Sequence, residues 1–126
     1  MDTRVKIKNL DELRSLVAED RWTALVGAFD PLTAEAVETI ERARTPGRKL
    51  LVVVRSEPDE LLSAESRAIL LAGLRSVDAV HVAETEDWRS VVESGSVSIV
   101  EQENPCRPRQ EFRALVQAKQ NASPEA

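Results

Sequence analysis

The chain has 126 residues, of which 42% are hydrophobic and 31% are charged, and its formal net charge is -5. This length suits one globular domain with a core of its own. The acidic balance and an aromatic content of 3% argue against nucleic acid or an anionic membrane surface as a partner.

The sequence shows neither a targeting signal nor a membrane-spanning segment. Residues 1–12 lack the apolar core of a signal peptide, and no apolar run reaches the roughly 20 residues that a bilayer requires. We therefore expect a cytoplasmic protein. Cys106 is the only cysteine, which excludes an internal disulfide and a CxxC metal or redox site.

Hydrophobic periodicity predicts the first helix and the first strand. Residues 9–20 have apolar side chains at helical spacing, and Asn9 or Asp11 is suited to cap their amino terminus. Residues 22–29 (WTALVGAF) are almost wholly apolar, as in a strand whose two faces are both covered.

A second helix is predicted over residues 32–44, and it is followed by the strongest strand pattern of the chain, KLLVVV (49–54). Asp30 and Pro31, which precede this helix, are typical of an N-cap and a first helical position. The turn between the first strand and this helix therefore has an ordinary structural interpretation that requires no ligand.

The rest of the chain continues the alternation. Further segments are expected in the order helix 63–74, strand 77–82, helix 86–94, strand 96–102 and helix 109–119. Because strands alternate with helices, we predict an α/β fold: a Rossmann-like, doubly wound parallel sheet of about four to five strands in three α/β/α layers. It would form one domain over residues 1–120, followed by a flexible tail over 121–126.

Ligands of such sheets bind at the carboxyl ends of the strands, where the turn at residues 27–33 is expected. The segment GAFDPLTAEAV (27–37) resembles the signature loop G-x-F-D-x-x-H-x-G-H of the cytidylyltransferase-like nucleotidyltransferases. The likeness is closest to the heptose-1-phosphate adenylyltransferase (ADP-heptose synthase) domain. It continues through AVETIERARTPGRKLLVVVRSEPDE (36–60) and SAESRAILLAGLRSVDAVHVAETED (63–87), and covers roughly residues 5–90.

The resemblance implies a reaction in which a phosphate group attacks the α-phosphorus of ATP or CTP, with Mg²⁺ as cofactor and pyrophosphate as the leaving group. It implies nucleotide-binding roles for residues that match the family pattern. These residues are Gly27, Phe29, Asp30 and Arg67.

Other positions of the signature depart from the family. Thr33 stands at the first histidine, Glu35 at the intervening glycine and Ala36 at the second histidine, while Arg55 begins the segment that is Asn-Ser-Asp in the family. Each lost donor to a transition-state oxyanion costs about 2.7–4 kcal/mol. A carboxylate at position 35 would also occupy the positive end of the helix and repel a triphosphate.

The remaining candidates are weak. Thr33 and Arg55 are candidate catalytic residues, and Arg107 and Arg109, which form a basic cluster with Arg113, are candidate anion-binding residues. For Thr33 we favour an ordinary helix-start role, and for the arginine cluster we favour a solvated face. No metal site is predicted.

Two further side chains have ordinary structural interpretations. His81 has no cysteine or histidine companion and is expected to be a surface or partly packed residue. Arg67 is expected to pair with Glu65 on a helix surface, although a structural or a nucleotide-side role stays open, because the resembled family keeps this arginine.

The sequence therefore favours a degenerate nucleotidyltransferase-like domain with little or no transferase activity, which acts as a binding or regulatory module. The alternative is an active, divergent nucleotidyltransferase that transfers a nucleotidyl group from ATP or CTP to a sugar phosphate or related phosphate. Candidate partners are a nucleotide, a sugar phosphate, a second copy of the chain or another protein.

Overall fold

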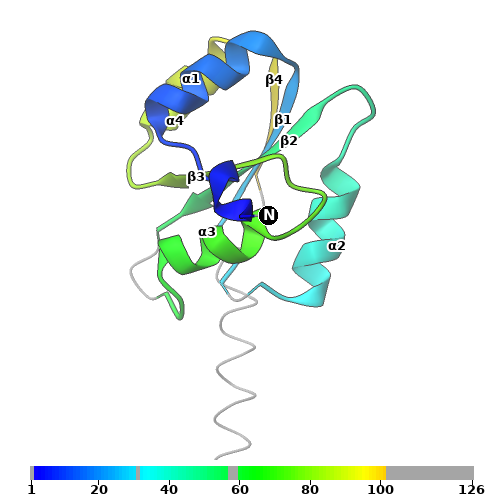
Figure 1. Ribbon diagram of the computed structural model, residues 1–126, viewed down its shortest axis with the longest axis vertical. Helices are drawn as coiled ribbons and strands as arrows, with labels where there is room; N and C mark the ends of the chain where they lie inside the picture. The colour runs from blue at the N-terminus through cyan, green and yellow to red at the C-terminus, as the bar shows by residue number, and fades with distance from the viewer. Residues whose placement is uncertain (1, 31, 57–59, 102–126) are drawn as a thin grey trace, which may run out of the picture.

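The computed structural model describes residues 2–30, 32–56 and 60–101 (Figure 1). Its elements, in chain order, are η1 (Thr3–Lys6), α1 (Leu10–Glu19), β1 (Trp22–Gly27), α2 (Ala34–Ala43), β2 (Lys49–Arg55), α3 (Ala64–Ala72), β3 (Ala79–Ala83), α4 (Asp87–Glu93) and β4 (Val97–Glu101). Each helix and strand predicted before residue 102 is present. The short 3₁₀ helix η1 was not predicted, and the helix expected over 109–119 lies outside the described residues.

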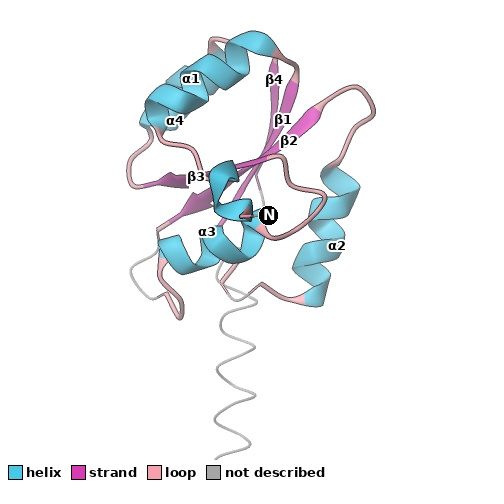
Figure 2. Cartoon of the chain, viewed as in Figure 1, coloured by secondary structure: helices cyan, strands magenta, loops and turns pink. Residues whose placement is uncertain are grey.

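The four described strands form one parallel sheet in the order β3-β2-β1-β4. Helices α2 and α3 cover one face, and α1 and α4 cover the other, which gives three layers (Figure 2). The chain moves outward from β1 to β3 on one side and returns through α4 to β4 on the other. The predicted doubly wound, Rossmann-like α/β fold is thereby confirmed, with its topological switch point between β1 and β4.

The two central strands have mainly apolar interiors because both of their faces are buried. Residues of β1 alternate between the two core clusters, with Leu25 facing α2 and α3 and Val26 facing α1 and α4. Residues 50–54 of β2 are at most 1% exposed. None of the helices in the described ranges combines the length and the apolar character that crossing a membrane requires.

Side-chain caps fix where the helices begin. Asn9 caps α1 in a capping box with Glu12, as one of the two predicted alternatives. For α2, the interpretation of Asp30 as the N-cap is wrong, and that of Thr33 as a helix-start residue is confirmed. The Thr33 hydroxyl oxygen accepts a hydrogen bond from the backbone N–H of Ala36 at 3.1 Å, and the helix begins at Ala34. A hydroxyl cap satisfies one of the otherwise unpaired N–H groups of the first turn.

Ile40 lies between α2 and the sheet and is fully buried. We expect Ile40→Ala to lower the free energy of unfolding by about 2–5 kcal/mol, because the lost side chain leaves a cavity in the core. Urea unfolding followed by circular dichroism measures this change. Ile69→Ala, at a position of α3 that is 45% exposed, is the matched control, and an equal loss in both variants would contradict the layer arrangement.

Candidate functional site

The carboxyl ends of the strands bring together five residues that the sequence singles out. Gly27 ends β1, Phe29 and Asp30 follow it, Arg55 ends β2, and Arg67 reaches this edge from α3. The predicted candidates Arg107 and Arg109 lie outside the described residues, as do Arg113 and Cys106.

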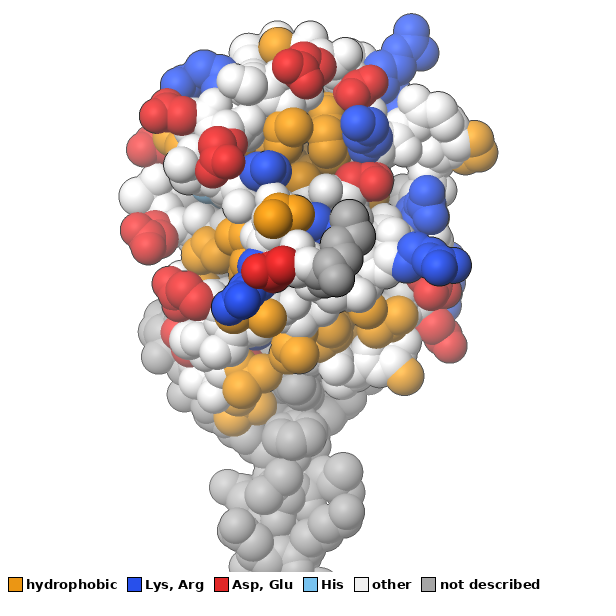
Figure 3. All heavy atoms as spheres, in the orientation of Figure 1, with side chains coloured by type: hydrophobic (Ala, Val, Ile, Leu, Met, Phe, Trp, Pro, Cys, Tyr) orange, Lys and Arg blue, Asp and Glu red, His pale blue; other side chains and the backbone are white. Residues whose placement is uncertain are grey.

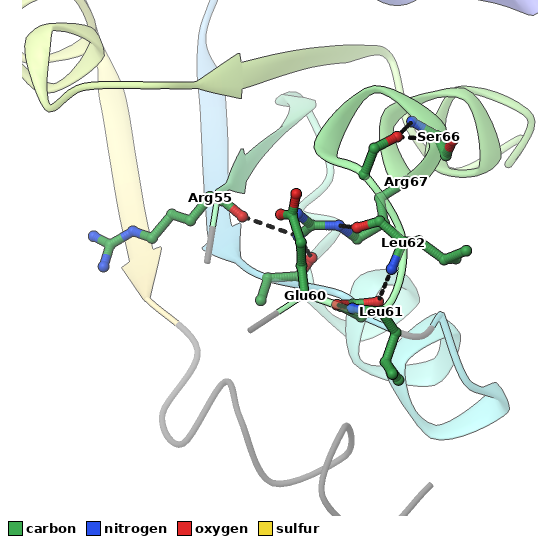
Figure 4. A network of polar contacts seen from close by, with 9 residues as sticks. Arg55, Glu60, Leu61, Leu62, Ser66 and Arg67 are labelled. Carbon is green, nitrogen blue, oxygen red and sulfur yellow. Dashed lines mark hydrogen bonds and ion pairs between the residues drawn. The ribbon is translucent and has the colours of Figure 1, made fainter. Parts of the chain in front are cut away.

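Arg67 is a fully buried cation at the centre of this edge. Its Nε donates to the carbonyl oxygen of Leu62 at 3.1 Å, and its Nη1 donates to the carbonyl oxygen of Arg55 at 2.9 Å and to that of Ala28. Its Nη2 lies 2.5 Å from the Glu60 carboxylate (Figure 4). All three guanidinium nitrogens are therefore engaged by the protein itself.

These contacts correct the sequence interpretation of Arg67. It does not pair with Glu65 on a helix surface, since it has no exposed surface and its carboxylate partner is Glu60. A buried charge is tolerated only when its hydrogen-bonding capacity is met. Arg67 joins the ends of β1 and β2 to the segment before α3, which is a structural role and not a phosphate-binding one.

The Asp30 carboxylate binds the same segment before α3 that Arg67 contacts. Asp30 is 1% exposed, and its carboxylate accepts hydrogen bonds from the backbone N–H groups of Leu61 and Leu62, the second at 3.0 Å. The carboxylate thus fixes the same segment that Arg67 holds through the Leu62 carbonyl. No described contact directs Asp30 toward a ligand position.

Arg55 extends away from Arg67 toward β4, as Figure 4 shows. Its Nη2 lies 3.3 Å from the Glu101 carboxylate and 3.9 Å from that of Glu86. Arg89 of α4 contacts the same two carboxylates. Two arginines and two glutamates form this Arg55–Glu101 cluster (Arg55, Glu86, Arg89 and Glu101), so it presents no net charge to a ligand.

The electrostatics of the cluster favour its ionised state. The hydrogen bond from Arg89 holds the pKa of the Glu101 carboxyl below its ordinary value, and Glu101 in turn raises the pKa of Arg89. Both side chains are partly exposed, so solvent screens their attraction. The chemical consequence is that the carboxylate stays available to neutralise the two arginines over the physiological pH range.

The loop after β1 keeps an unusual backbone. Phe29 has a φ of 52°, which is uncommon for a residue with a side chain. Its ring is 4% exposed and packs in the core under α2 and α3. Core packing of Phe29 and the Asp30 hydrogen bonds together hold this strained conformation. At the start of α2, the Thr33 oxygen caps the helix, and Glu35 lies exposed in the first turn.

His81 is more deeply placed than the sequence suggested. It is 8% exposed in β3, and its Nδ1 lies 2.8 Å from the carbonyl oxygen of Lys8. It therefore anchors the segment before α1 to the edge of the sheet. Within residues 2–30, 32–56 and 60–101, no three His, Cys, Asp or Glu side chains come together in a way that could hold a metal ion.

Sequence reasoning missed the acids that satisfy the arginines. Glu60 precedes Arg67 by seven positions, and Glu101 follows Arg89 by twelve. Side chains at these separations are not brought into contact by a single helical turn or a tight turn, so the sequence spacing did not indicate either ion pair. Their positions become apparent only when strands β1, β2 and β4 are placed side by side.

No protein-family model matches the chain, and neither does any curated protein.

We expect Arg67→Met to lower the free energy of unfolding by about 3–5 kcal/mol, because it removes the buried cation that donates to three backbone carbonyl groups and contacts the Glu60 carboxylate. Arg42→Met, at a largely exposed arginine of α2 that pairs only with Glu38, should cost less than 1 kcal/mol. Chemical unfolding measures both. Comparable small losses would mean that Arg67 does not organise the edge.

Arg89→Gln should raise the pKa of the Glu101 carboxyl toward its ordinary value, because the main hydrogen bond that lowers it is lost. Since a lowered folded-state pKa contributes stability above the unfolded-state pKa, that contribution disappears as pH falls through the folded-state value, and the variant should lose less stability on acidification. Carbon-detected NMR titration of Glu101 measures the shift. An unchanged pKa of Glu101 would show that Arg89 does not interact with it as the Arg55–Glu101 cluster requires. Arg42→Gln, which removes an arginine outside the cluster, is the control.

Proposed function

We propose that this chain is a degenerate nucleotidyltransferase-like domain with little or no transferase activity, which acts as a binding or regulatory module. The observation that carries the proposal is that the charged groups of the candidate edge are compensated within the protein. Arg67 is fully buried and bound to Glu60, and Arg55 pairs with Glu101.

Phosphoryl and nucleotidyl transfer depend on positioned donors and cations that neutralise the developing charge. For Arg67 to serve a triphosphate, it would have to leave a buried carboxylate contact and several carbonyl groups, and breaking such a buried pair costs about 3–5 kcal/mol. Arg55 would have to leave Glu101 and Glu86, whose charges also repel the ligand. Glu35 adds a further negative charge at the amino end of α2.

The partner most consistent with this surface is another protein. Leu62, Ile69 and Leu70 are 37%, 45% and 49% exposed at or near α3. Figure 3 shows hydrophobic side chains gathered across the lower part of this face, where α3 lies. Apolar side chains grouped on a surface are typical of an interaction site.

The alternative is an active, divergent enzyme that uses ATP or CTP with Mg²⁺ and releases pyrophosphate. The retained strand–loop–helix frame, with the positive φ of Phe29 and the amino end of α2, favours it. In that case Thr33, Arg55 and the arginines at 107 and 109 would supply the donors.

A thermal-shift experiment separates the two hypotheses. We expect no change in Tm with ATP or CTP, with or without Mg²⁺, because the groups that would bind phosphate are occupied. A ligand present at 100 times its Kd would add about 2.7 kcal/mol to stability, which for a domain of this size raises Tm by several degrees.

The matched variant is the full chain carrying Thr33→His, Glu35→Gly and Ala36→His, which restores the signature donors. If the wild type shows a saturable, Mg²⁺-dependent increase in Tm and releases pyrophosphate, the module proposal is wrong and the enzyme hypothesis holds. If neither protein responds, the site is lost beyond its signature residues, as the Arg67 and Arg55 contacts predict.

A further inference from the structure

Strand β4 is covered on one face only. Val97 and Ile99 are half-buried and pack against the cluster beneath α1 and α4. Ser98 and Val100, which alternate with them, face the side of α2 and are exposed, Val100 by 44%. Since residues of a strand alternate between its two faces, the described helices leave the α2 side of β4 open.

A groove of about 510 Å³ lies along this open face. Its floor is formed by Thr23 and Leu25 of β1 and by their sheet partners Ser98 and Val100 of β4. Thr39 and Ala43 of α2 form one wall. Arg42, Thr45 and Arg48 complete the lining, and most of the surface that the groove exposes is apolar.

The chain continues from the end of this groove. Strand β4 ends at Glu101, and residues 102–126 follow. Phe112, Leu115 and Val116 have the spacing that places three apolar side chains on one face of a helix. Residues 109–119 are thus an amphipathic segment that lies close in sequence to an unfilled apolar groove.

We propose that residues 109–119 pack into this groove as a helix antiparallel to β4, with Phe112, Leu115 and Val116 against Val100, Leu25 and Ala43. The lengths agree, because an eleven-residue helix spans about 16 Å and the five residues of β4 span about the same distance. Residues 102–108 serve as the connection, which is one residue longer than the usual strand-to-helix loop of about two to six residues.

The tether decides between this occupant and a second copy of the chain. A segment joined by a short connection experiences an effective concentration in the millimolar range. A second copy would reach that concentration only in a very concentrated solution. The inference goes beyond the proposed function and stands whether or not a nucleotide binds.

Two full-length variants test the proposal. Leu115→Asp places a charge on the face that should contact the groove, and Ala114→Asp places the same charge on the opposite face. We expect Leu115→Asp to shift the backbone amide NMR signals of Ser98, Val100 and Ala43 and to lower Tm by about 5 °C or more, while Ala114→Asp does neither. Val100→Asp should lower Tm as well, and its effect combined with Leu115→Asp should be smaller than the sum.

Two outcomes would overturn the proposal. If Leu115→Asp leaves the groove signals and Tm unchanged, residues 109–119 do not occupy the groove. If its effects appear only at high protein concentration, together with a dimer in analytical ultracentrifugation, the occupant is a second copy and not the chain's own segment.

Discussion

The buried guanidinium of Arg67 is the constraint on which the carboxyl edge of this sheet depends. The Arg67 side chain donates hydrogen bonds to the backbone carbonyl groups of Ala28, Arg55 and Leu62 and to the carboxylate of Glu60. A cation without access to water must keep these partners, since each lost contact leaves a desolvated charge or polar group. A single residue therefore fixes the ends of β1 and β2 and the segment before α3 relative to one another. The Asp30 carboxylate stabilises the same segment by accepting hydrogen bonds from its backbone N–H groups.

This arrangement explains how a fold suited to phosphate chemistry can lack a free cationic site among its described residues. In doubly wound sheets the ligand lies beyond the carboxyl ends of the strands, where helix termini and cationic side chains are free to bind it. Here Arg67 is enclosed, Arg55 is paired with Glu101, and the Thr33 oxygen caps α2. The edge is internally neutral and firmly connected, which suits a module that presents a stable surface better than an enzyme that must grip a triphosphate.

Hydrophobic periodicity and capping preferences predicted the fold well, whereas contacts between residues far apart in the sequence could not be predicted from them. The apolar run 50–54 and the apolar spacing in 9–20 depend on burial within one element, so periodicity revealed them. Asp30 and Thr33 both suited the start of α2, and only the structure shows that Thr33 makes the capping hydrogen bond, because both residue types suit a cap. Arg67 was paired with Glu65, since the spacing along the chain cannot show that Glu60 and the ends of two strands surround it. The Arg55–Glu101 cluster combines β2, α4 and β4, and only the sheet order brings these elements together.

The central claim is that the arginines of the edge are committed to protein partners. The Nε–Hε NMR signal of Arg67 and the Nη2 NMR signal of Arg55 report on those contacts directly, because Arg67 Nε donates to the Leu62 carbonyl and Arg55 Nη2 contacts Glu101. Both signals can be followed while tripolyphosphate or MgATP is added to millimolar concentration. The account predicts that the Arg67 signal exchanges slowly with solvent and that neither signal moves beyond the small change produced by added salt. A saturable shift of both signals, with loss of the Arg55–Glu101 contact, would contradict it.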